Sequence, residues 1–493
     1  PRPAPVVPGS PEQQAGVDAA QALQPGESLA VNAKAGTGKT FLLEKAAATL
    51  RGRVLVLVFN RRGQVELQAR VRVPAGSSLR IQTFDAYAKG IIPGGYGPTG
   101  KPHYGKAYVH AKNQSGPGYI PNVRTHYVCK EVIDLAMGLG VGLPGERPCT
   151  VDTFRYIIDE YAKRVPKGSS PDKVAVDAMR LFKVVTADNA THSFADASYA
   201  AARDGLPASV QYDWVLVDEF QDLNPVQFLM LDALVARGAR LIFVGDPRQS
   251  IYGWRGAGTA SFELGVVRYA AKVYPLTVTR RCPKSVVAEA QRIVPDIRPL
   301  DTADEGEVTT LDPGDAFSDT LAAVADDPTE YGTTAVVCRN NAPLIQAALG
   351  FVRRGVKVCV LGRDITADVN YLVGHAVFTS KWHHTDKGAW TAYREKLTTE
   401  LKDRPFVLAS ELERADIAQA LWEHALAPAT TRPKDVGDVL VLLAEVMAAY
   451  LADDPVPGSV VFTTVHRAKG LEWDNVFFLA PENLPGKLAV KAR

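Results

Sequence analysis

A short pattern near the start of the chain, in which an apolar run leads into a glycine-rich loop and then a helix, restricts the possible folds most strongly. The run ends at Val31, the loop reads AKAGTGKT over residues 33–40, and a helical stretch follows at Phe41 to Leu50. Glycines let backbone N–H groups close around phosphate oxygens, and the start of the helix adds a favourable partial charge. The pattern therefore predicts a strand, a phosphate-binding loop and a helix in an α/β fold.

The same alternation of apolar runs and helical stretches returns along the 493 residues. Fully apolar strands followed by helices are typical of parallel sheets covered on both faces. After the first run, the apolar runs span residues 53–59, 214–217, 241–244, 335–338, 357–361, 460–464 and 476–479. The chain is too long for one core of roughly 100–200 residues. The predicted fold class is therefore α/β, with two parallel-sheet cores.

Two segments interrupt this alternation, and both are predicted to be mainly helical insertions. Residues 91–205 start with a Gly/Pro/Tyr-rich stretch and continue as amphipathic helices, while residues 366–455 lie between strands of the second core. The predicted first core comprises residues 1–90 and 206–274, and the second comprises residues 275–365 and 456–493.

Composition excludes several classes of protein. Hydrophobic residues make up 46% and charged residues 22%, which is ordinary for a globular protein. No apolar run approaches the ~20 residues of a membrane span, and no signal peptide is visible. The five cysteines form no CxxC pair, which argues against a disulfide framework or a zinc ribbon. We expect a cytoplasmic, nucleoid-associated or nuclear protein, neither secreted nor in a membrane. The net charge of +2 means that any nucleic-acid site is a local groove.

Two acidic residues follow the apolar run at 214–217, where a buried strand is expected to end. Asp218 is placed to bind Mg²⁺ with the hydroxyl of Thr40, and Glu219 is placed to polarise an attacking water as general base. Lys39 in the glycine-rich loop is expected to reach the β- and γ-phosphates of a nucleotide. A solvated acidic turn is the alternative. It is disfavoured because an apolar strand delivers the acids to the sheet edge where ligands bind.

A third segment, VGDPRQSIYGWRGA at residues 244–257, follows another strand end. Gln249 is placed to sense a γ-phosphate. Tyr252 and Trp254 lie beside Arg255, and aromatic residues next to a cation suit stacking on unpaired bases. Taken alone, the segment is equally compatible with Trp254 as a core residue.

Together and in this order, these segments resemble the UvrD/Rep/PcrA family of superfamily 1 helicases. The string QSIYGWRGA is the most specific, because ordinary ATPases lack it. Further segments that resemble family motifs are PEQQ at 11–14, FNR at 59–61, QTFD at 82–85, VTRRCP at 278–283 and TTVHRAKGLEWD at 463–474. The motifs span residues 11 to 479, nearly the whole chain. The resemblance implies two RecA-like cores of the P-loop NTPase type.

The resemblance also implies a role for individual residues, with ATP and Mg²⁺ as cofactors. Gln13 would read adenine, Arg281 of the second core would be an arginine finger, and Glu472 would contact the ribose. The implied catalytic residues are Lys39, Asp218, Glu219, Gln249 and Arg281. The implied nucleotide-binding residues are Gln13, Ala35, Gly36, Thr37, Gly38, Lys39, Thr40, Arg280, Arg281, Gly470 and Glu472. The implied DNA-binding residues are Phe59, Asn60, Arg61, Thr83, Phe84, Tyr252, Trp254, Arg255, His466 and Lys469.

The implied activity is ATP-dependent translocation on single-stranded DNA in the 3′→5′ direction, coupled to unwinding or to displacement of bound protein. ATP would lie between the cores. The expected partners are single-stranded DNA or a duplex with a single-stranded tail, with recombination, repair or replication proteins, and the expected state is a monomer or weak oligomer. Two alternatives stay open: an ATP-gated DNA-binding or scaffolding protein, and the motor of a helicase–nuclease. The second is disfavoured because no acidic nuclease cluster follows Glu472.

Three features depart from the family pattern. Arg280 stands where relatives have a tyrosine that stacks on adenine, although a guanidinium plane can also stack. The insertion at 366–455 is shorter than in UvrD and Rep and closer to that of the F-box helicase branch. The last family motif, with a second arginine finger, is not found before Arg493. Either the sequence is truncated or the protein lacks this finger, and we favour truncation.

Overall fold

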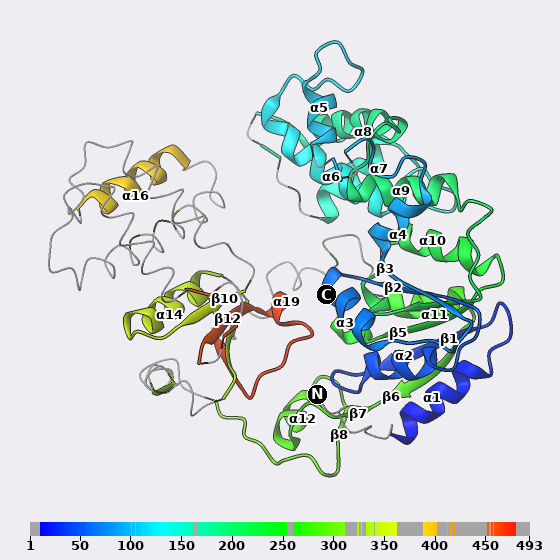
Figure 1. Ribbon diagram of the computed structural model, residues 1–493. Coiled ribbons are helices and arrows are strands. Elements are labelled where there is room, and N and C mark those ends of the chain that lie inside the picture. Colours follow the sequence, from blue (N-terminus) through cyan, green and yellow to red (C-terminus); the bar gives the residue numbers. More distant parts are fainter. Residues whose placement is uncertain are drawn as a thin grey trace. The chain divides into compact units, whose positions relative to one another are not determined.

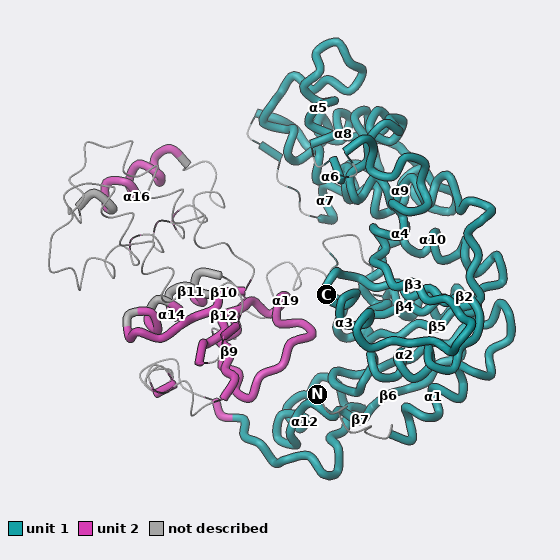
Figure 2. Tube along the Cα trace, viewed as in Figure 1, with its two compact units in different colours: residues 1–308 teal, residues 309–493 magenta. Residues whose placement is uncertain are grey.

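The structure, a computed structural model, forms two compact units, residues 1–308 and 309–493 (Figures 1 and 2). The residues that it describes are 10–310 apart from 100, 104, 162, 164, 167, 252 and 254–259, and in the later part 323–324, 327, 332–339, 341–361, 388–401, 412, 415, 419, 451–452, 455–456 and 458–479. Among these residues, none of the helices combines the length and the apolar character that crossing a membrane requires.

The first unit is built on a sheet of six parallel strands in the order β3-β2-β4-β5-β1-β6. In that order the strands are Ser78–Thr83, Arg53–Val58, Trp214–Val217, Arg240–Gly245, Ser28–Ala33 and Lys272–Leu276. In the middle of the sheet, Val31 pairs with Val244 and Val56 pairs with Leu216. The order is not sequential, so the chain crosses over the sheet between strands. This confirms the predicted α/β class.

Side chains from successive strand residues pack in two separate cores, one on each face of the sheet. Leu241 and Phe243 belong to one core, and Ile242 and Val244 belong to the other, as the alternation of a strand requires. The first core includes helices α4 (Phe84–Ile91), α10 (Pro225–Val235) and α11 (Ser261–Arg268). The second includes α1 (Pro11–Gln21), α2 (Lys39–Ala47) and α3 (Arg61–Arg70). Figure 1 shows α10 and α1 on opposite sides of the sheet. This double cover explains why the central strands are apolar throughout.

Residues between β3 and β4 form the mainly helical segment expected there. After α4, its helices are α5 (Lys106–Lys112), η1 (Val123–Thr125), α6 (His126–Gly138), α7 (Val151–Glu160), α8 (Pro171–Ala187) and α9 (Phe194–Asp204). The unit continues beyond β6 through β7 (Val278–Thr279), α12 (Lys284–Ala290) and β8 (Arg298–Pro299) to residue 308. The four-part domain scheme itself stays a prediction.

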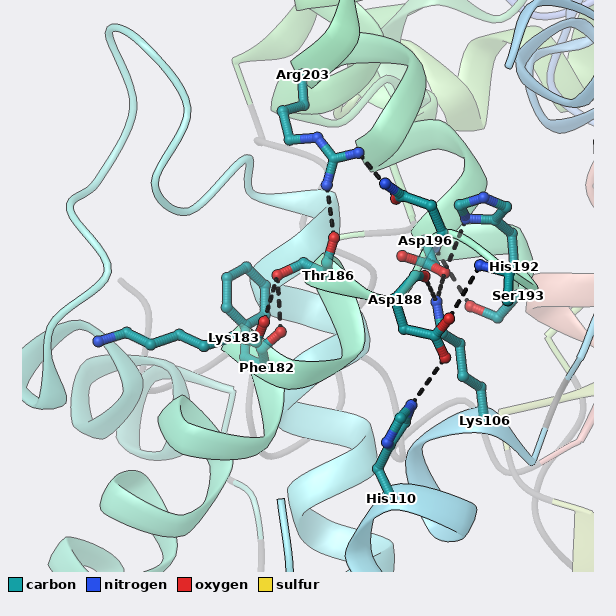
Figure 3. A network of polar contacts seen from close by, with 12 residues as sticks. Lys106, His110, Phe182, Lys183, Thr186, Asp188, His192, Ser193, Asp196 and Arg203 are labelled. Atoms are coloured by element: carbon teal, nitrogen blue, oxygen red, sulfur yellow. Dashed lines mark hydrogen bonds and ion pairs between the residues drawn. The ribbon is translucent and has the colours of Figure 1, made fainter. Parts of the chain in front are cut away.

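A buried polar network attaches the segment that joins α8 to α9 to helix α5 (Figure 3). Lys106 of α5 donates hydrogen bonds from Nζ to the backbone oxygen of Asp188 and to Asp196 Oδ2, the latter at 2.6 Å. The same Asp196 oxygen lies 3.0 Å from His192 Nδ1. His110 Nε2 lies 2.9 Å from Asp188 Oδ2. A buried cation needs such partners because burial removes its water shell.

The second unit contains a five-stranded parallel sheet in the order β11-β10-β12-β9-β13. The strands are Leu451–Ala452, Val358–Val360, Val460–Thr464, Thr334–Cys338 and Asn475–Leu479. Helices α14 (Asn341–Arg353), α16 (Gly388–Leu401) and α19 (Val465–Ala468) complete its described elements. The second predicted α/β core is therefore confirmed as a sheet. Most of the predicted insertion at residues 366–455 lies outside the described residues.

A cluster of aromatic rings packs directly behind the acidic turn that follows β4. Phe220 is fully buried, and its ring centroid lies 4.0 Å from that of Phe243 and 5.3 Å from that of Phe228. Helix α11 passes so close that a Cβ added at Gly265 would lie 2.2 Å from Phe220 Cε1. Only glycine therefore fits at position 265 without displacing the ring.

We expect Gly265→Ala to lower the free energy of unfolding of the first unit by about 1–3 kcal/mol, because overpacking forces rings and helix apart. Gly90→Ala is the matched control, since Gly90 is also helical but is exposed, with no atom within 4 Å of an added Cβ. That change should be neutral or stabilising by up to about 1 kcal/mol. Chemical denaturation of both variants checks this, and equal stability would contradict the close packing.

Candidate active site

The glycine-rich loop joins β1 to α2 and makes two unusually close approaches. Gly36 and Gly38 have φ angles of 71° and 87°, which lie in the left-handed region. A Cβ at Gly36 would lie 2.5 Å from Thr279 Oγ1, and one at Gly38 would lie 2.3 Å from Gln13 Nε2. Gly38 is also the N-cap of α2 and offers no side chain to the first N–H groups of the helix. An anion can serve these donors instead.

Hydrogen bonds hold this loop from both sides. Inside the loop, Thr37 Oγ1 donates to the backbone oxygen of Lys34 at 2.8 Å. From α1, Gln13 Nε2 donates to the backbone oxygen of Thr37 at 2.9 Å. From the segment after β6, the N–H of Arg280 donates to the backbone oxygen of Gly36 at 2.9 Å. These hydrogen bonds within the protein fix the shape of the loop.

Gln13, predicted to read adenine, supports the loop in this structure. Its side chain is only 3% exposed, and its Oε1 accepts a hydrogen bond from the N–H of Ser10 at 2.9 Å. Its neighbour Glu12 accepts hydrogen bonds from the N–H and Oγ1 of Thr277 at 2.8 and 2.7 Å. Helix α1 thus fixes both the loop and the segment after β6, while adenine recognition by Gln13 stays a prediction.

The two predicted acids lie at the carboxyl end of β4. Glu219 Oε1 is 3.4 Å from Lys39 Nζ, although β5 separates β4 from β1 in the sheet. Glu219 has a φ of 53°, which is uncommon for a residue other than glycine, and its N–H donates to Asp218 Oδ1 at 3.0 Å. Such backbone strain concentrates at functional sites. The structure therefore brings together the loop lysine and the two acids.

Burial and the neighbouring Glu219 raise the pKa of Asp218 to about 7, while the charge of Lys39 partly opposes that rise. A cation placed here would relieve the unfavourable concentration of negative charge. The Asp218 carboxylate and the hydroxyl of Thr40, in the first turn of α2, are hard oxygen donors of the kind that Mg²⁺ prefers. These residues therefore fit the predicted Mg²⁺ site.

Gln221 was missed by the sequence analysis. Its side chain is 1% exposed and connects two strand ends, because Nε2 donates to Glu219 Oε2 and Oε1 accepts from the N–H of Asp246 at 3.0 Å. Asp246 Oδ2 in turn accepts a hydrogen bond from Nε2 of the predicted sensor Gln249 at 2.6 Å. The available signal was an amide two residues after Glu219, directly after a strand expected to be buried. Its partner after β5 could not be read from the sequence.

Arg280 and Arg281 lie beside the loop in the first compact unit, and both side chains are exposed. The backbone of this segment passes close enough that an added Cβ at Gly36 would lie 2.6 Å from Arg281 Cβ. Arg281 was predicted to belong to the second core. The structure groups it with the first unit, since Glu12 anchors the preceding Thr277 to α1. The finger role of Arg281 stays a prediction.

Four predicted DNA-binding residues lie at the carboxyl ends of β2 and β3. Asn60 and Arg61 are exposed, and Phe59 and Thr83 are partly buried. Asn60 Oδ1 accepts from the N–H of Gly63 at 2.8 Å, and Thr83 Oγ1 accepts from the N–H of Ala86 at 3.1 Å, so these two residues cap α3 and α4. Their DNA contacts stay predictions.

The prediction for Phe84 requires a correction. Its side chain is 2% exposed and belongs to the core on one face of the sheet, so it offers no surface to a base. Its position as the first residue of the amphipathic helix α4 explains the burial. Tyr252, Trp254 and Arg255 lie outside the described residues.

In the second unit, the predicted ligand-binding residues cluster after β12. His466 lies on α19, with Nδ1 3.4 Å from Arg339 Nη1, and burial and this guanidinium lower the pKa of His466. Lys469 is partly buried, and Glu472 is exposed. Gly470 between them has a φ of 81° and so turns the chain in the left-handed region. Ala35 in the first unit is likewise partly buried, within the loop.

Comparisons with known proteins agree with this geometry. Residues 188–264 match the UvrD/REP helicase N-terminal domain. A probable DNA helicase of Mycoplasma pneumoniae is 26% identical over 285 residues, which are 53% of this chain and 51% of that protein. The RecBCD enzyme subunit RecB of Mycobacterium tuberculosis is 36% identical over 101 residues, 20% of this chain and 9% of that protein. The ATP-dependent DNA helicase PcrA of Leuconostoc citreum is 49% identical over 47 residues, 10% of this chain and 6% of that protein.

The chain thus spans at most about half of the length of these relatives. The matched segment nevertheless contains the acids after β4 and the Gln249 turn after β5. The glycine-rich loop, FNR, QTFD and TTVHRAKGLEWD lie at the ends of β1, β2, β3 and β12, whereas PEQQ begins α1 and VTRRCP follows β6. In its matched domain and in these relatives, the chain is similar to the UvrD-like DNA helicases of superfamily 1.

Proposed function

We propose that the protein is an ATP-dependent DNA helicase that hydrolyses ATP to ADP and phosphate while it moves along single-stranded DNA. The observation that carries this proposal is the contact between Lys39 and Glu219 at 3.4 Å, beside the glycine-rich loop. The contact joins a phosphate-binding lysine to an acid that can act as general base. The names of the relatives support DNA as the second ligand.

The triphosphate would bind over the loop, with its negative charge facing the loop N–H groups and Lys39. Thr40 and Asp218 would hold Mg²⁺, which neutralises charge that develops on the phosphates. Lys39 would contact the phosphates, and the Glu219 carboxylate would accept a proton from the attacking water. Gln249 would contact the γ-phosphate, and Arg281 would stabilise the transition state.

Movement on DNA would follow from ATP-driven closure and opening of the two α/β cores. Phe59, Asn60 and Arg61 lie at the carboxyl edge of the first sheet, and His466 and Lys469 follow a strand of the second. Cationic contacts would make binding weaken as salt rises. The 3′→5′ direction and a substrate with a single-stranded tail are proposed from the resemblance. ATPase rates with and without single-stranded DNA separate this motor from an ATP-gated binding protein, whose turnover DNA would not stimulate.

We expect Lys39→Ala to abolish DNA-stimulated ATP hydrolysis and leave the fold intact, because Lys39 lies outside both cores of the first unit. Lys45→Ala is the matched control, since Lys45 lies on the same helix with its Nζ over the Phe41 ring at 5.2 Å from the centroid. Phosphate release and thermal melting are measured for both variants. Nearly normal turnover of the Lys39 variant would refute the phosphate-binding role.

Glu219→Gln should retain binding of ATP and Mg²⁺ but lose turnover, because Asp218 remains while the general base is lost. The expected loss in kcat is about 10²- to 10⁴-fold. Affinity for a fluorescent ATP analogue is measured beside phosphate release. Glu263→Gln, which changes an exposed acid in α11, serves as control. A Glu219 variant that binds nucleotide poorly yet hydrolyses normally would show the assignment to be wrong.

For the DNA path, Trp254→Ala should weaken single-strand affinity by about 1–3 kcal/mol through the lost stacking on one base. Basal ATPase without DNA should change little, and Trp254→Phe should restore much of the affinity because it keeps a ring. Fluorescence anisotropy with labelled oligonucleotide and thermal melting decide the matter. A large fall in melting temperature with unchanged DNA affinity would instead assign Trp254 to the core.

A further inference from the structure

A chain of side-chain contacts runs through the base of the candidate site from the loop lysine to the proposed sensor. Lys39 Nζ lies 3.4 Å from one oxygen of Glu219, and the other oxygen accepts a hydrogen bond from Gln221. The opposite end of the Gln221 amide accepts from the N–H of Asp246 at 3.0 Å. The Asp246 carboxylate accepts from Gln249 at 2.6 Å. Gln221 is thus the one link between the end of β4 and the end of β5 in this described chain of contacts.

The surroundings fix the Gln221 side chain in this position. It is 1% exposed, and a Cβ added at Gly245 would lie 2.6 Å from its Oε1. The backbone oxygen of Gln221 accepts a hydrogen bond from Ser250 Oγ at 3.2 Å, which ties the same residue to the segment after Gln249. A buried amide with both ends engaged has a fixed orientation, because rotation would leave polar atoms unsatisfied.

We propose that Gln221 is a positioning residue that aligns the Glu219 carboxylate with the Gln249 turn, so that general base and γ-phosphate sensor are set together. This proposal rests on the proposed function. Glu219 needs such a restraint because its backbone has a φ of 53°, in a sparsely populated region. A displacement of about 1 Å at a reacting group can cost about 10²-fold in rate. Gln221 itself touches neither ATP nor the attacking water.

The two ends of the Gln221 amide make different contacts, so its alignment of Glu219 can be tested separately from its support of the turn after β4. Gln221→Glu keeps an oxygen that can accept from the Asp246 N–H but loses the Nε2 donor to Glu219. Gln221→Met has similar length and loses both contacts. Both variants should show kcat for DNA-stimulated ATP hydrolysis reduced about 10- to 100-fold. KM and affinity for a fluorescent ATP analogue should stay within about threefold, because the loop is untouched.

Ser261→Ala is the matched control, because Ser261 Oγ donates to the backbone oxygen of Leu223 at 2.9 Å and supports the same turn without contacting Glu219. It should retain near-normal kcat. If loss of support for the turn were enough to lower kcat, Ser261→Ala would lower it as well. Normal kcat in the Glu and Met variants would overturn the proposal.

A double-mutant cycle supplies the decisive readout. In a Glu219→Gln background, Gln221→Glu should reduce kcat by less than about threefold further, because a residue that acts through Glu219 has nothing left to align. If the double variant instead lost kcat by the product of the two single-variant losses, Gln221 would act independently of Glu219, which would refute the inference. Failure of the proposed function looks different, because the unsubstituted protein would then show no DNA-stimulated ATP hydrolysis.

Discussion

Parallel pairing of β4, β5 and β1 is the constraint on which the candidate site depends. Pairing in this order brings the ends of all three strands to the same edge of the sheet, although β1 and β4 are separated by about 180 residues. Lys39 meets Glu219 across the end of β5. That strand ends in Gly245, where an added Cβ would lie 2.6 Å from Gln221 Oε1, so the glycine leaves room for the Gln221 side chain. The chemistry of the site is therefore a consequence of sheet order and of one glycine at a strand end.

The acidic turn is also tied to the hydrophobic core by adjacent residues. Glu219 projects into the site, and the next residue, Phe220, is fully buried among other aromatic rings. A strained backbone conformation persists only where the surrounding packing holds it in place. The Phe220 ring supplies such a restraint beside Glu219. The rigidity of the site thus comes from core packing below it as much as from hydrogen bonds within it.

Much of the fold was predictable because the central strands are buried on both faces, so their sequences are uninterrupted runs of apolar residues. The run at 214–217 has the observed bounds of β4, whereas β3 and β6 at the sheet edges were missed because their sequences, SLRIQT and KVYPL, are partly polar or contain proline. Lys39, Asp218 and Glu219 were predictable from local spacing. The role of Gln221, the burial of Phe84 and the support of the loop by Gln13 were not, since each depends on a partner distant in sequence.

The dependence of the phosphate loop on α1 has a practical consequence for handling the protein. Gln13 belongs to the capping box that starts α1 and also reaches the loop 24 residues later. Proteolytic trimming, a cleavage scar or a fused tag that disturbs the first turn of α1 would therefore loosen the glycine-rich loop, although the change lies outside the loop. A shortened protein that binds nucleotide weakly would therefore point first to damage at this turn.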